Sequence, residues 1–437
     1  MISAIIFSAL FLSGIFFFSW NIRKIRSNIL LGRDISRSDF KSKRIKNMLL
    51  VAFGQQKMFK KPIPAILHLM LYTAFIITQI ELIEIIADGV SSSHRMFQGA
   101  LGSFYTFIIS FIEILSILAF IATFIFLIRR NLLKIPRFRM SEMNGWPKLD
   151  GNIILIAEII LICFIIMMNG ADEVLQLKEG NGSYSFAISQ YLGPLLFGEF
   201  NNETLHIIER IGWWGHLIMV LSFLNYLPFS KHFHILLAFP NTYYSNLDSK
   251  GKFTNNEAVT KEVKLMLDPS ADPYATPSNN NQEIKRFGAK DVTDLTWKNL
   301  MDSYTCTECG RCSSACPANQ TGKLLSPRKI MMDTRDRLEE VGKNKRSHGN
   351  DYEDGKSLLG DYVTEEELWA CTSCNACVEE CPVNIDPLSI IMEMRRYLVM
   401  EESKAPSELT NMFTNIENNG APWQFSQADR INWKNEN

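Results

Sequence analysis

The sequence lacks net charge, and most of it lacks cysteine. Its 437 residues include 45 Lys and Arg against 46 Asp and Glu, which leaves a formal net charge of −1. Without a basic excess, nothing indicates a nucleic-acid partner, which would need a clustered basic surface. Only Cys163 precedes residue 306, and the other eight cysteines lie between Cys306 and Cys381. No Ser/His/Asp or Cys/His nucleophile set is present, so bond-making chemistry on an organic substrate is not expected.

Hydropathy divides the chain into two unlike halves. The mean hydropathy is 0.00, but residues 1–239 carry long apolar runs and residues 240–437 are polar. About 20 apolar residues cross the hydrocarbon core of a bilayer as a helix. A single-domain soluble enzyme is therefore excluded, and an all-α bundle is predicted for the first half. Five segments are long enough to span: 2–20, 62–87, 104–128, 151–169 and 207–230.

Lys and Arg are concentrated in alternate loops between these segments. The loops 21–61 and 129–150 hold twelve and six of them, whereas the loops 88–103 and 170–206 hold one each. Loops rich in Lys and Arg stay in the cytoplasm. The first segment has no basic leader and no small-residue cleavage site, so it is predicted to be an uncleaved helix. We predict a multi-pass protein of a bacterial cytoplasmic membrane, with its N-terminus outside and all residues after 230 cytoplasmic.

Histidines within or beside the predicted spans are costly there and usually functional. His68 lies near the cytoplasmic end of the second span, and His216 lies in the outer half of the fifth. His234 follows His216 by 18 residues, which in a continuous helix is five turns and about 27 Å. A haem b between two helices needs one imidazole from each at matching depth. His68 and His234 match in depth; the alternative is that these histidines only form hydrogen bonds within the bundle.

The stretch from His216 to His234, with Pro228-Phe-Ser230 between them, resembles the last helix of the dihaem cytochrome b subunit of respiratory nitrate reductase. Relatives in membrane-bound heterodisulfide reductase share the pattern. That family carries a second pair of histidines, ten residues apart, on its second helix. In this sequence the two positions are His68 and Thr78. Threonine does not ligate haem iron. The resemblance therefore implies a cytochrome b-type bundle with one haem b at His68 and His234, and His216 as a second haem ligand or a quinone or structural partner.

Several carboxylates also lie in or near the spans. Glu81 and Glu158 are candidate quinone or proton-transfer groups, because buried carboxylates relay protons in membrane proteins. Glu84 and Asp88 lie close to the outer interface, where we expect them to be solvated.

The strongest signal is a repeated cysteine motif. Residues 306–317 read Cys-Thr-Glu-Cys-Gly-Arg-Cys-Ser-Ser-Ala-Cys-Pro, and residues 371–382 read Cys-Thr-Ser-Cys-Asn-Ala-Cys-Val-Glu-Glu-Cys-Pro. In two-cluster ferredoxins, three thiolates of such a motif bind one [4Fe–4S] cluster and the fourth binds the other cluster. The first cluster is thus predicted on Cys306, Cys309, Cys312 and Cys381. The second is predicted on Cys371, Cys374, Cys377 and Cys316.

Two other uses of these cysteines fit the motif less well. Zinc sites usually show separate Cys-x₂-Cys halves rather than a run of four ending in Cys-Pro. Disulfides are disfavoured in the reducing cytoplasm, where the topology places this half. Cys163, alone in a predicted span, is expected to be a packing residue.

The second half divides into three parts. Residues 240–290, rich in proline and polar residues, are predicted to be a linker. Residues 291–405 are predicted to form a mainly helical dicluster domain, because no strand pattern stands out. Residues 406–437 form an aromatic tail, either a partner-docking segment or a folded-back cap. Helices are expected at 331–341, 364–370 and 388–401.

Four stretches around the cysteine motifs indicate a particular family: Asp294-Leu-Thr-Trp297 and residues 321–328, 369–383 and 394–400. They resemble heterodisulfide-reductase-like iron–sulfur proteins, including membrane oxidoreductases that pass electrons from electron-transfer flavoprotein to menaquinone. Fuller members continue into a catalytic Cys-Cys-Gly module, which is absent here and expected on another subunit.

The resemblance implies a membrane-bound electron-transfer subunit that is inactive alone. Electrons from a cytoplasmic partner would pass through both clusters and haem b to menaquinone. One alternative is the reverse flow, from menaquinol to a disulfide or other cytoplasmic acceptor. The other is a non-catalytic iron–sulfur sensor or scaffold in the membrane.

Overall fold

The computed structural model describes residues 2–180, 183–249, 251–268, 270 and 286–435. Within these ranges every regular element is a helix. The β-structure among them is limited to two isolated bridges, Arg33 with Thr296 and Leu359 with Val363. The predicted all-α fold is confirmed.

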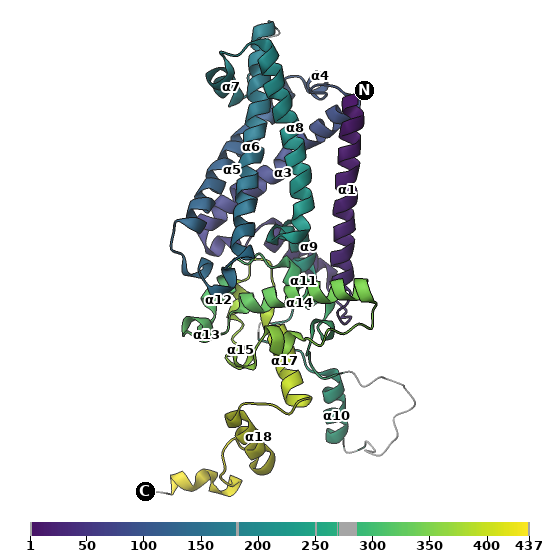
Figure 1. The fold of residues 1–437 in the computed structure, drawn as a ribbon. Helices are drawn as coiled ribbons and strands as arrows, with labels where there is room; N and C mark the ends of the chain where they lie inside the picture. Colours follow the sequence, from purple (N-terminus) through teal and green to yellow (C-terminus); the bar gives the residue numbers. More distant parts are fainter. Residues whose placement is uncertain (1, 181–182, 250, 269, 271–285, 436–437) are drawn as a thin grey trace.

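Five long helices form the N-terminal bundle, and each is long and apolar enough to cross a membrane. Most of their ends extend beyond the predicted bounds, because polar turns continue each helix past the apolar core that hydropathy detects. Their outer faces expose large apolar side chains such as Leu12, Phe16 and Phe107, which suit hydrocarbon rather than water. The five are α1 (Ile2–Ile29), α3 (Pro62–Ser91), α5 (Ser103–Asn131), α6 (Trp146–Glu179) and α8 (Asn202–Tyr226) (Figure 1).

The bundle helices pack in a fixed order. α6 packs against α5 and α8, α3 packs against α5, and α1 contacts both α3 and α8. Two glycines permit close approach. A Cβ at Gly89 of α3 would lie 2.4 Å from the ring of Phe7, and one at Gly212 of α8 would lie 2.7 Å from the backbone nitrogen of Met168. A side chain at either position would push helices apart.

The two ends of the bundle differ. One end, which we call the distal end, carries α4 (Gln98–Leu101) and α7 (Ser189–Phe197), while the other, the cluster end, meets the C-terminal half (Figure 1). Both basic loops lie at the cluster end. Their short elements are α2 (Lys41–Met48), a π-turn (Leu49–Phe53) and three 3₁₀ turns (Met58–Lys60, Pro136–Phe138 and Ser141–Met143).

The C-terminal half forms a helical domain beneath the bundle. One apolar core joins the two, because Ile25 of α1 and Leu227 pack with Leu300, Ile330 and Leu398 of the domain. All three helices expected in this region are confirmed. The helices are α11 (Trp297–Thr305), α12 (Arg311–Ala315), α13 (Pro317–Gln320), α14 (Pro327–His348), α15 (Glu365–Trp369), α16 (Ala376–Glu380) and α17 (Pro387–Met400), with turns at Val292–Asp294 and Leu358–Tyr362.

Local sequence fixes the helix starts that position the cysteine loops. The Ser326 side chain accepts a hydrogen bond from the Lys329 backbone at the start of α14, with Pro327 in the first turn. Thr364 and Glu367 form a reciprocal capping box at the start of α15. Such caps satisfy the free N–H groups of a first helical turn.

The segment predicted as a linker contains two helices. α9 (His234–Tyr243) includes Pro240, and α10 (Glu257–Leu267) follows. α9 packs on α11 and α2, and this tertiary packing outweighs the local cost of proline. The polar run 278–282 lies outside the described residues, and the domain boundaries stay predictions.

The tail forms α18 (Ser407–Asn419) and a 3₁₀ segment (Gln427–Lys434) that project away from the domain (Figure 1). Trp423, Phe425 and Trp433 are exposed. A folded-back cap would bury these rings, so this arrangement favours partner docking.

Candidate cofactor sites

The two cysteine loops share one backbone conformation. In the first, Glu308 and Gly310 on either side of Cys309 have φ of 53° and 69°. In the second, Ser373 and Asn375 on either side of Cys374 have φ of 52° and 60°. Left-handed residues are uncommon outside glycine, so four at matched positions mark two copies of one ligand-binding turn.

The fourth cysteine of each motif ends its loop in the same way. Cys316 and Cys381 both have extended backbones, with φ/ψ of −74°/120° and −70°/122°, and proline follows each. α12 of the first loop packs against α16 of the second. The two motifs therefore face each other across a local pseudo-twofold arrangement.

The fourth cysteine of each motif lies close enough to the opposite motif for its charge to act on cysteines there. Burial raises the pKa of Cys306 to about 12, and the nearby charges of Cys309 and Cys381 add to the rise. Burial also raises the pKa of Cys377, and the charges of Cys371 and Cys316 contribute. Cys381 is thus close enough to act on Cys306, and Cys316 is close enough to act on Cys377.

Hydrogen bonds to sulfur are one means of tuning a cluster's reduction potential. The backbone nitrogen of Ser373 lies 3.4 Å from Cys371 Sγ, and that of Ile385 lies 3.3 Å from Cys381 Sγ.

In the described part of the chain, no three His, Cys, Asp or Glu side chains gather closely enough to hold a single metal ion. The cluster assignment therefore rests on the motifs and their matched loops.

His68 and His234 face each other at the cluster end of the bundle. Their ring centroids are 6.4 Å apart, with the ring planes at 42°. Two imidazoles that bind one metal through nitrogens at about 2 Å have centroids roughly 6 Å apart. The spacing therefore fits a shared iron.

The remaining nitrogen of each ring has an acceptor. His68 Nδ1 lies 3.0 Å from Gln55 Oε1, and His234 Nδ1 lies 3.0 Å from the Lys231 carbonyl oxygen. Metal-bound histidines characteristically donate their other N–H in this way, which leaves Nε2 free to bind metal. Sequence reasoning missed Gln55, which lies 13 residues before His68 in a loop.

The last span is not one continuous helix. α8 ends at Tyr226, and two 3₁₀ turns, Leu227–Phe229 and Lys231–Phe233, separate it from α9. The five-turn extrapolation from His216 to His234 is therefore wrong, because Pro228 and Ser230 interrupt the helix. The break also brings the His232 ring to 5.4 Å from His234, centroid to centroid.

His216 lies apart from the histidine pair. It is buried in α8, and its Nδ1 has no hydrogen-bond partner in the described structure. Thr78, at the position of the missing fourth ligand, bonds to the Phe75 carbonyl oxygen at 3.3 Å.

A buried ionic cluster joins the bundle to the first cysteine loop. Lys231 contacts Glu308, and Arg335 donates to the same carboxylate at 2.8 Å. Burial alone would raise the pKa of Glu308, but Lys231 and Arg335 outweigh it and hold that pKa below its ordinary value. Because Lys231 also accepts from His234 through its carbonyl oxygen, one residue touches both the histidine pair and the loop.

A second link passes through Arg311, between Gly310 and Cys312. Its guanidinium donates to the Lys57 carbonyl oxygen at 3.3 Å, two residues from Gln55. Arg328, fully buried, pairs with Glu142 at 2.8 Å and donates to the Arg137 carbonyl oxygen at 2.7 Å. The first cysteine loop is thus held against the same loops that support His68.

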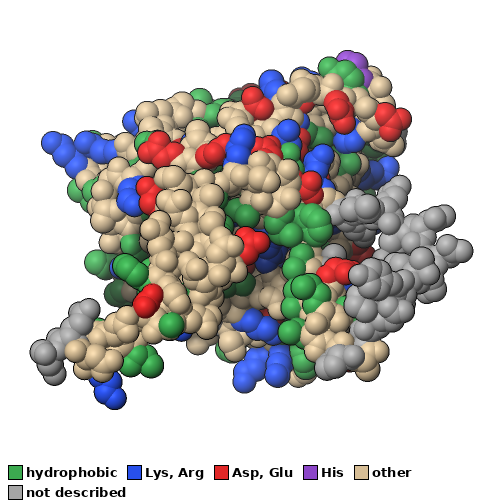
Figure 2. Space-filling view, turned by 90° about the horizontal axis from the view of Figure 1, so that it is seen from below, with side chains coloured by type: hydrophobic (Ala, Val, Ile, Leu, Met, Phe, Trp, Pro, Cys, Tyr) green, Lys and Arg blue, Asp and Glu red, His purple; other side chains and the backbone are tan. Residues whose placement is uncertain are grey.

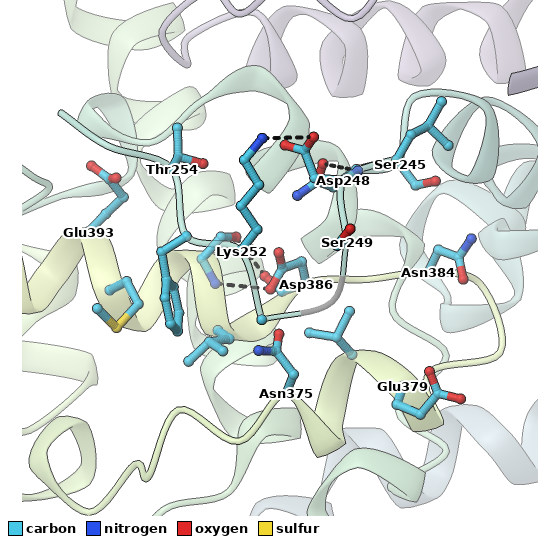
Figure 3. A pocket seen from close by; sticks show the side chains of 18 of the residues that line it. Ser245, Asp248, Ser249, Lys252, Thr254, Asn375, Glu379, Asn384, Asp386 and Glu393 are labelled. Atoms are coloured by element: carbon cyan, nitrogen blue, oxygen red, sulfur yellow. Dashed lines mark hydrogen bonds and ion pairs between the residues drawn. The ribbon is translucent and has the colours of Figure 1, made fainter. Parts of the chain in front are cut away.

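The second cysteine loop lies nearer to solvent. Cys374 is exposed, and a pocket of about 350 Å³ borders Asn375 and Val378 (Figure 3). Residues 245–249 and 251–254 line its opposite wall, with Lys252 paired to Asp248 at 3.3 Å. Seen from the cluster end, acidic and basic side chains are interspersed around a hollow (Figure 2).

The bundle carboxylates differ from one another. Glu158 accepts from Thr123 at 3.3 Å, whereas Glu81 is buried and one of its oxygens has no partner in the described residues. The expectation that Glu84 and Asp88 are solvated is wrong. Both are buried, because the loop after α3 folds over them and donates from the Phe97, Arg95 and Met96 backbones.

Comparison with known proteins identifies the C-terminal domain. Residues 302–385 match the family model described as 4Fe-4S dicluster domain. The chain is 29% identical over 465 residues to "Probable iron-sulfur-binding oxidoreductase FadF" of Bacillus subtilis, covering 99% of this chain and 61% of that protein. It is 28% identical over 443 residues to "EtfAB:quinone oxidoreductase" of Syntrophomonas wolfei, covering 95% and 57%.

A third relative matches a much shorter stretch. It is one component of the ferredoxin:CoB-CoM heterodisulfide reductase of Methanosarcina mazei, 29% identical over 107 residues, covering 24% of this chain and 52% of that protein. No solved structure matches. The chain spans about 60% of the length of the Bacillus and Syntrophomonas relatives. It therefore carries a 4Fe–4S dicluster domain behind five candidate membrane spans and is a homologue of iron–sulfur oxidoreductases.

Proposed function

We propose that this chain is the membrane-bound electron-transfer unit of a quinone-linked oxidoreductase. Electrons pass from a cytoplasmic partner through two [4Fe–4S] clusters and one haem b to menaquinone. The observation that carries the proposal is the His68–His234 pair at the cluster end, held through Lys231 and Gln55 beside the first cysteine loop.

The cluster ligands follow the crossed arrangement. Cys306, Cys309, Cys312 and Cys381 hold the first cluster, and Cys371, Cys374, Cys377 and Cys316 hold the second. The contacts of Glu308 and Arg311 support a position of the first cluster nearer to the histidine pair. The exposure of Cys374 and the adjacent pocket support a position of the second cluster nearer to the partner. Electrons thus enter at the second cluster and leave through the first.

Haem b supplies a one-electron carrier between the clusters and the quinone. His68 and His234 would hold it, while Gln55 and the Lys231 carbonyl oxygen fix the ring orientation and tautomer of each histidine.

The partner is proposed to be electron-transfer flavoprotein, acting with a Cys-Cys-Gly module supplied from outside these 437 residues. The name of the Syntrophomonas relative, EtfAB:quinone oxidoreductase, supports this donor and direction. The heterodisulfide reductase relative favours the second candidate, reduction of a disulfide or other cytoplasmic acceptor by menaquinol. A sensor or scaffold would not need paired imidazoles beside a cluster loop.

The assay that separates these functions uses membranes holding the chain and its partner module. With reduced electron-transfer flavoprotein, we expect a menaquinone analogue to be reduced, and we expect no turnover from this chain alone. Menaquinol-driven reduction of a disulfide without the flavoprotein reaction would favour the second candidate. Turnover by the isolated chain would contradict the need for a further module.

The cluster domain is proposed to lie in the cytoplasm and the distal end outside, because both basic loops lie at the cluster end. A cysteine introduced at Ser93, in the distal loop, should react with a membrane-impermeant maleimide in intact cells. One introduced at Ser403, in the cluster domain, should react only after the membrane is opened. The reverse labelling pattern would invert the topology.

A further inference from the structure

Several buried polar atoms of the bundle have no hydrogen-bond partner among the described residues, Ser116 Oγ and Glu173 Oε2 among them. Two others are Glu81 Oε2 on α3 and His216 Nδ1 on α8. Their residues are only 3% and 5% exposed. An unpaired polar group in such surroundings is costly, and natural proteins rarely keep one without a ligand or a function.

Both residues lie along α6: Glu81 contacts Asn169, and His216 lies near Leu161, about two turns nearer to the cluster end. Asn169 of α6 donates to the other oxygen of Glu81 at 3.4 Å. The preceding residue, Met168, touches Gly212 of α8. His216 lies four residues after Gly212, so it is one turn further along the same face of α8.

An apolar cluster closes the region between α1, α3, α6 and α8. On α3 it includes Ile85, one turn from Glu81, and on α8 it includes Trp213 and Leu217, which follows His216. Phe7 of α1 and Met168 of α6 complete it. Both polar atoms thus lie beside an apolar interior formed by several helices. That setting suits a flat ring that is apolar on its faces and polar at two opposite edges.

Polar groups connect Glu81 to the distal surface. Asn169 accepts from Arg95 at 2.8 Å, Arg95 pairs with Asp172, and His94 lies 3.5 Å from Asp172. His94 is partly exposed. Glu84 and Asp88 follow Glu81 at i+3 and i+7, on the same face of α3, which gives a row of carboxyl groups that leads to the same surface.

We infer that Glu81 and His216 bind the two carbonyl oxygens of a quinone headgroup, and that Glu81 protonates it. This site rests on the proposed function, which supplies the electrons. Reduction adds two electrons, delivered singly from the clusters through the haem, and two protons, so that both C=O oxygens become hydroxyls. The protons pass through Glu81, which regains each one from the distal surface along the polar row.

The test uses the purified full chain with its clusters, haem and partner module. Glu81→Gln keeps the shape and loses the proton, so quinone reduction should fall at least about tenfold while haem and cluster spectra stay unchanged. Glu81→Asp should recover part of the rate. His216→Ala should raise the dissociation constant of 2-heptyl-4-hydroxyquinoline N-oxide, a fluorescent quinone analogue, at least about tenfold. Thr78→Val, one turn from Glu81 on α3, is the matched control and should leave both quantities within about twofold.

A label on the unmodified protein makes the test independent of how the variants fold. A photoreactive azidoquinone should attach to the peptides that contain Glu81 or His216. Labelling near Glu158 instead, or variants that behave as Thr78→Val does, would overturn the site. Absence of quinone reduction in the unmodified complex would overturn the proposed function as well. Normal reduction with an unaffected Glu81→Gln variant would overturn the site alone.

Discussion

Replacing either His68 or His234 by alanine is expected to abolish haem binding. Each side chain would supply one of the two imidazoles that the proposed haem needs. A pyridine haemochrome assay should give about one haem per chain in the unmodified protein and close to none in either variant.

His216→Ala and His232→Ala are the matched controls for this loss. Both variants remove an imidazole that is not a proposed ligand, and the His232 ring centroid lies only 5.4 Å from that of His234. Neither variant should lose the haem. Two haems in the unmodified protein, or loss only with His216→Ala, would show that the dihaem arrangement of the related cytochromes is retained here.

Replacing Cys316 by serine is expected to remove the second cluster and spare the first. Although Cys316 is in the first motif, its charge acts on Cys371 and Cys377 of the second. Iron should fall from about eight to about four atoms per chain, and electron paramagnetic resonance of the reduced protein should lose one of two interacting cluster signals.

Cys381→Ser should give the converse result, because Cys381 lies with the first motif. Cys163→Ser, in the membrane bundle, is the control and should leave the iron content unchanged. If Cys316→Ser removed the first cluster instead, each motif would hold its own cluster and the crossed ligand sets would be wrong.

The parts of the molecule that sequence predicts well are those with a local signal. Five apolar runs predicted five candidate spans, and the cysteine spacing predicted a dicluster domain that the family comparison supports. Helix bounds were less predictable, because hydropathy detects only the apolar centre of a span. Pro240 was predicted to lie in a linker but is inside α9. Its conformation depends on tertiary packing, which has no local signal in the sequence.

The contacts that join the two halves have no local signal. Lys231 and Glu308 are 77 residues apart, and Arg328 and Glu142 are 186 apart. These pairs could not be predicted from sequence, because they form only when the cluster domain docks under the bundle. For the same reason, the burial of Glu84 could not be predicted, since it follows from the fold of the loop that carries Arg95.

The central claim is that electrons reach the quinone through the clusters and then the haem. Rapid mixing of the oxidised complex with reduced electron-transfer flavoprotein, followed at cluster and haem wavelengths, tests it most directly. The account predicts that the clusters bleach first, that the haem α-band then rises, and that a menaquinone analogue reoxidises the haem. In His68→Ala, the clusters should still bleach while quinone reduction stops. Quinone reduction at the normal rate in that variant would contradict the account.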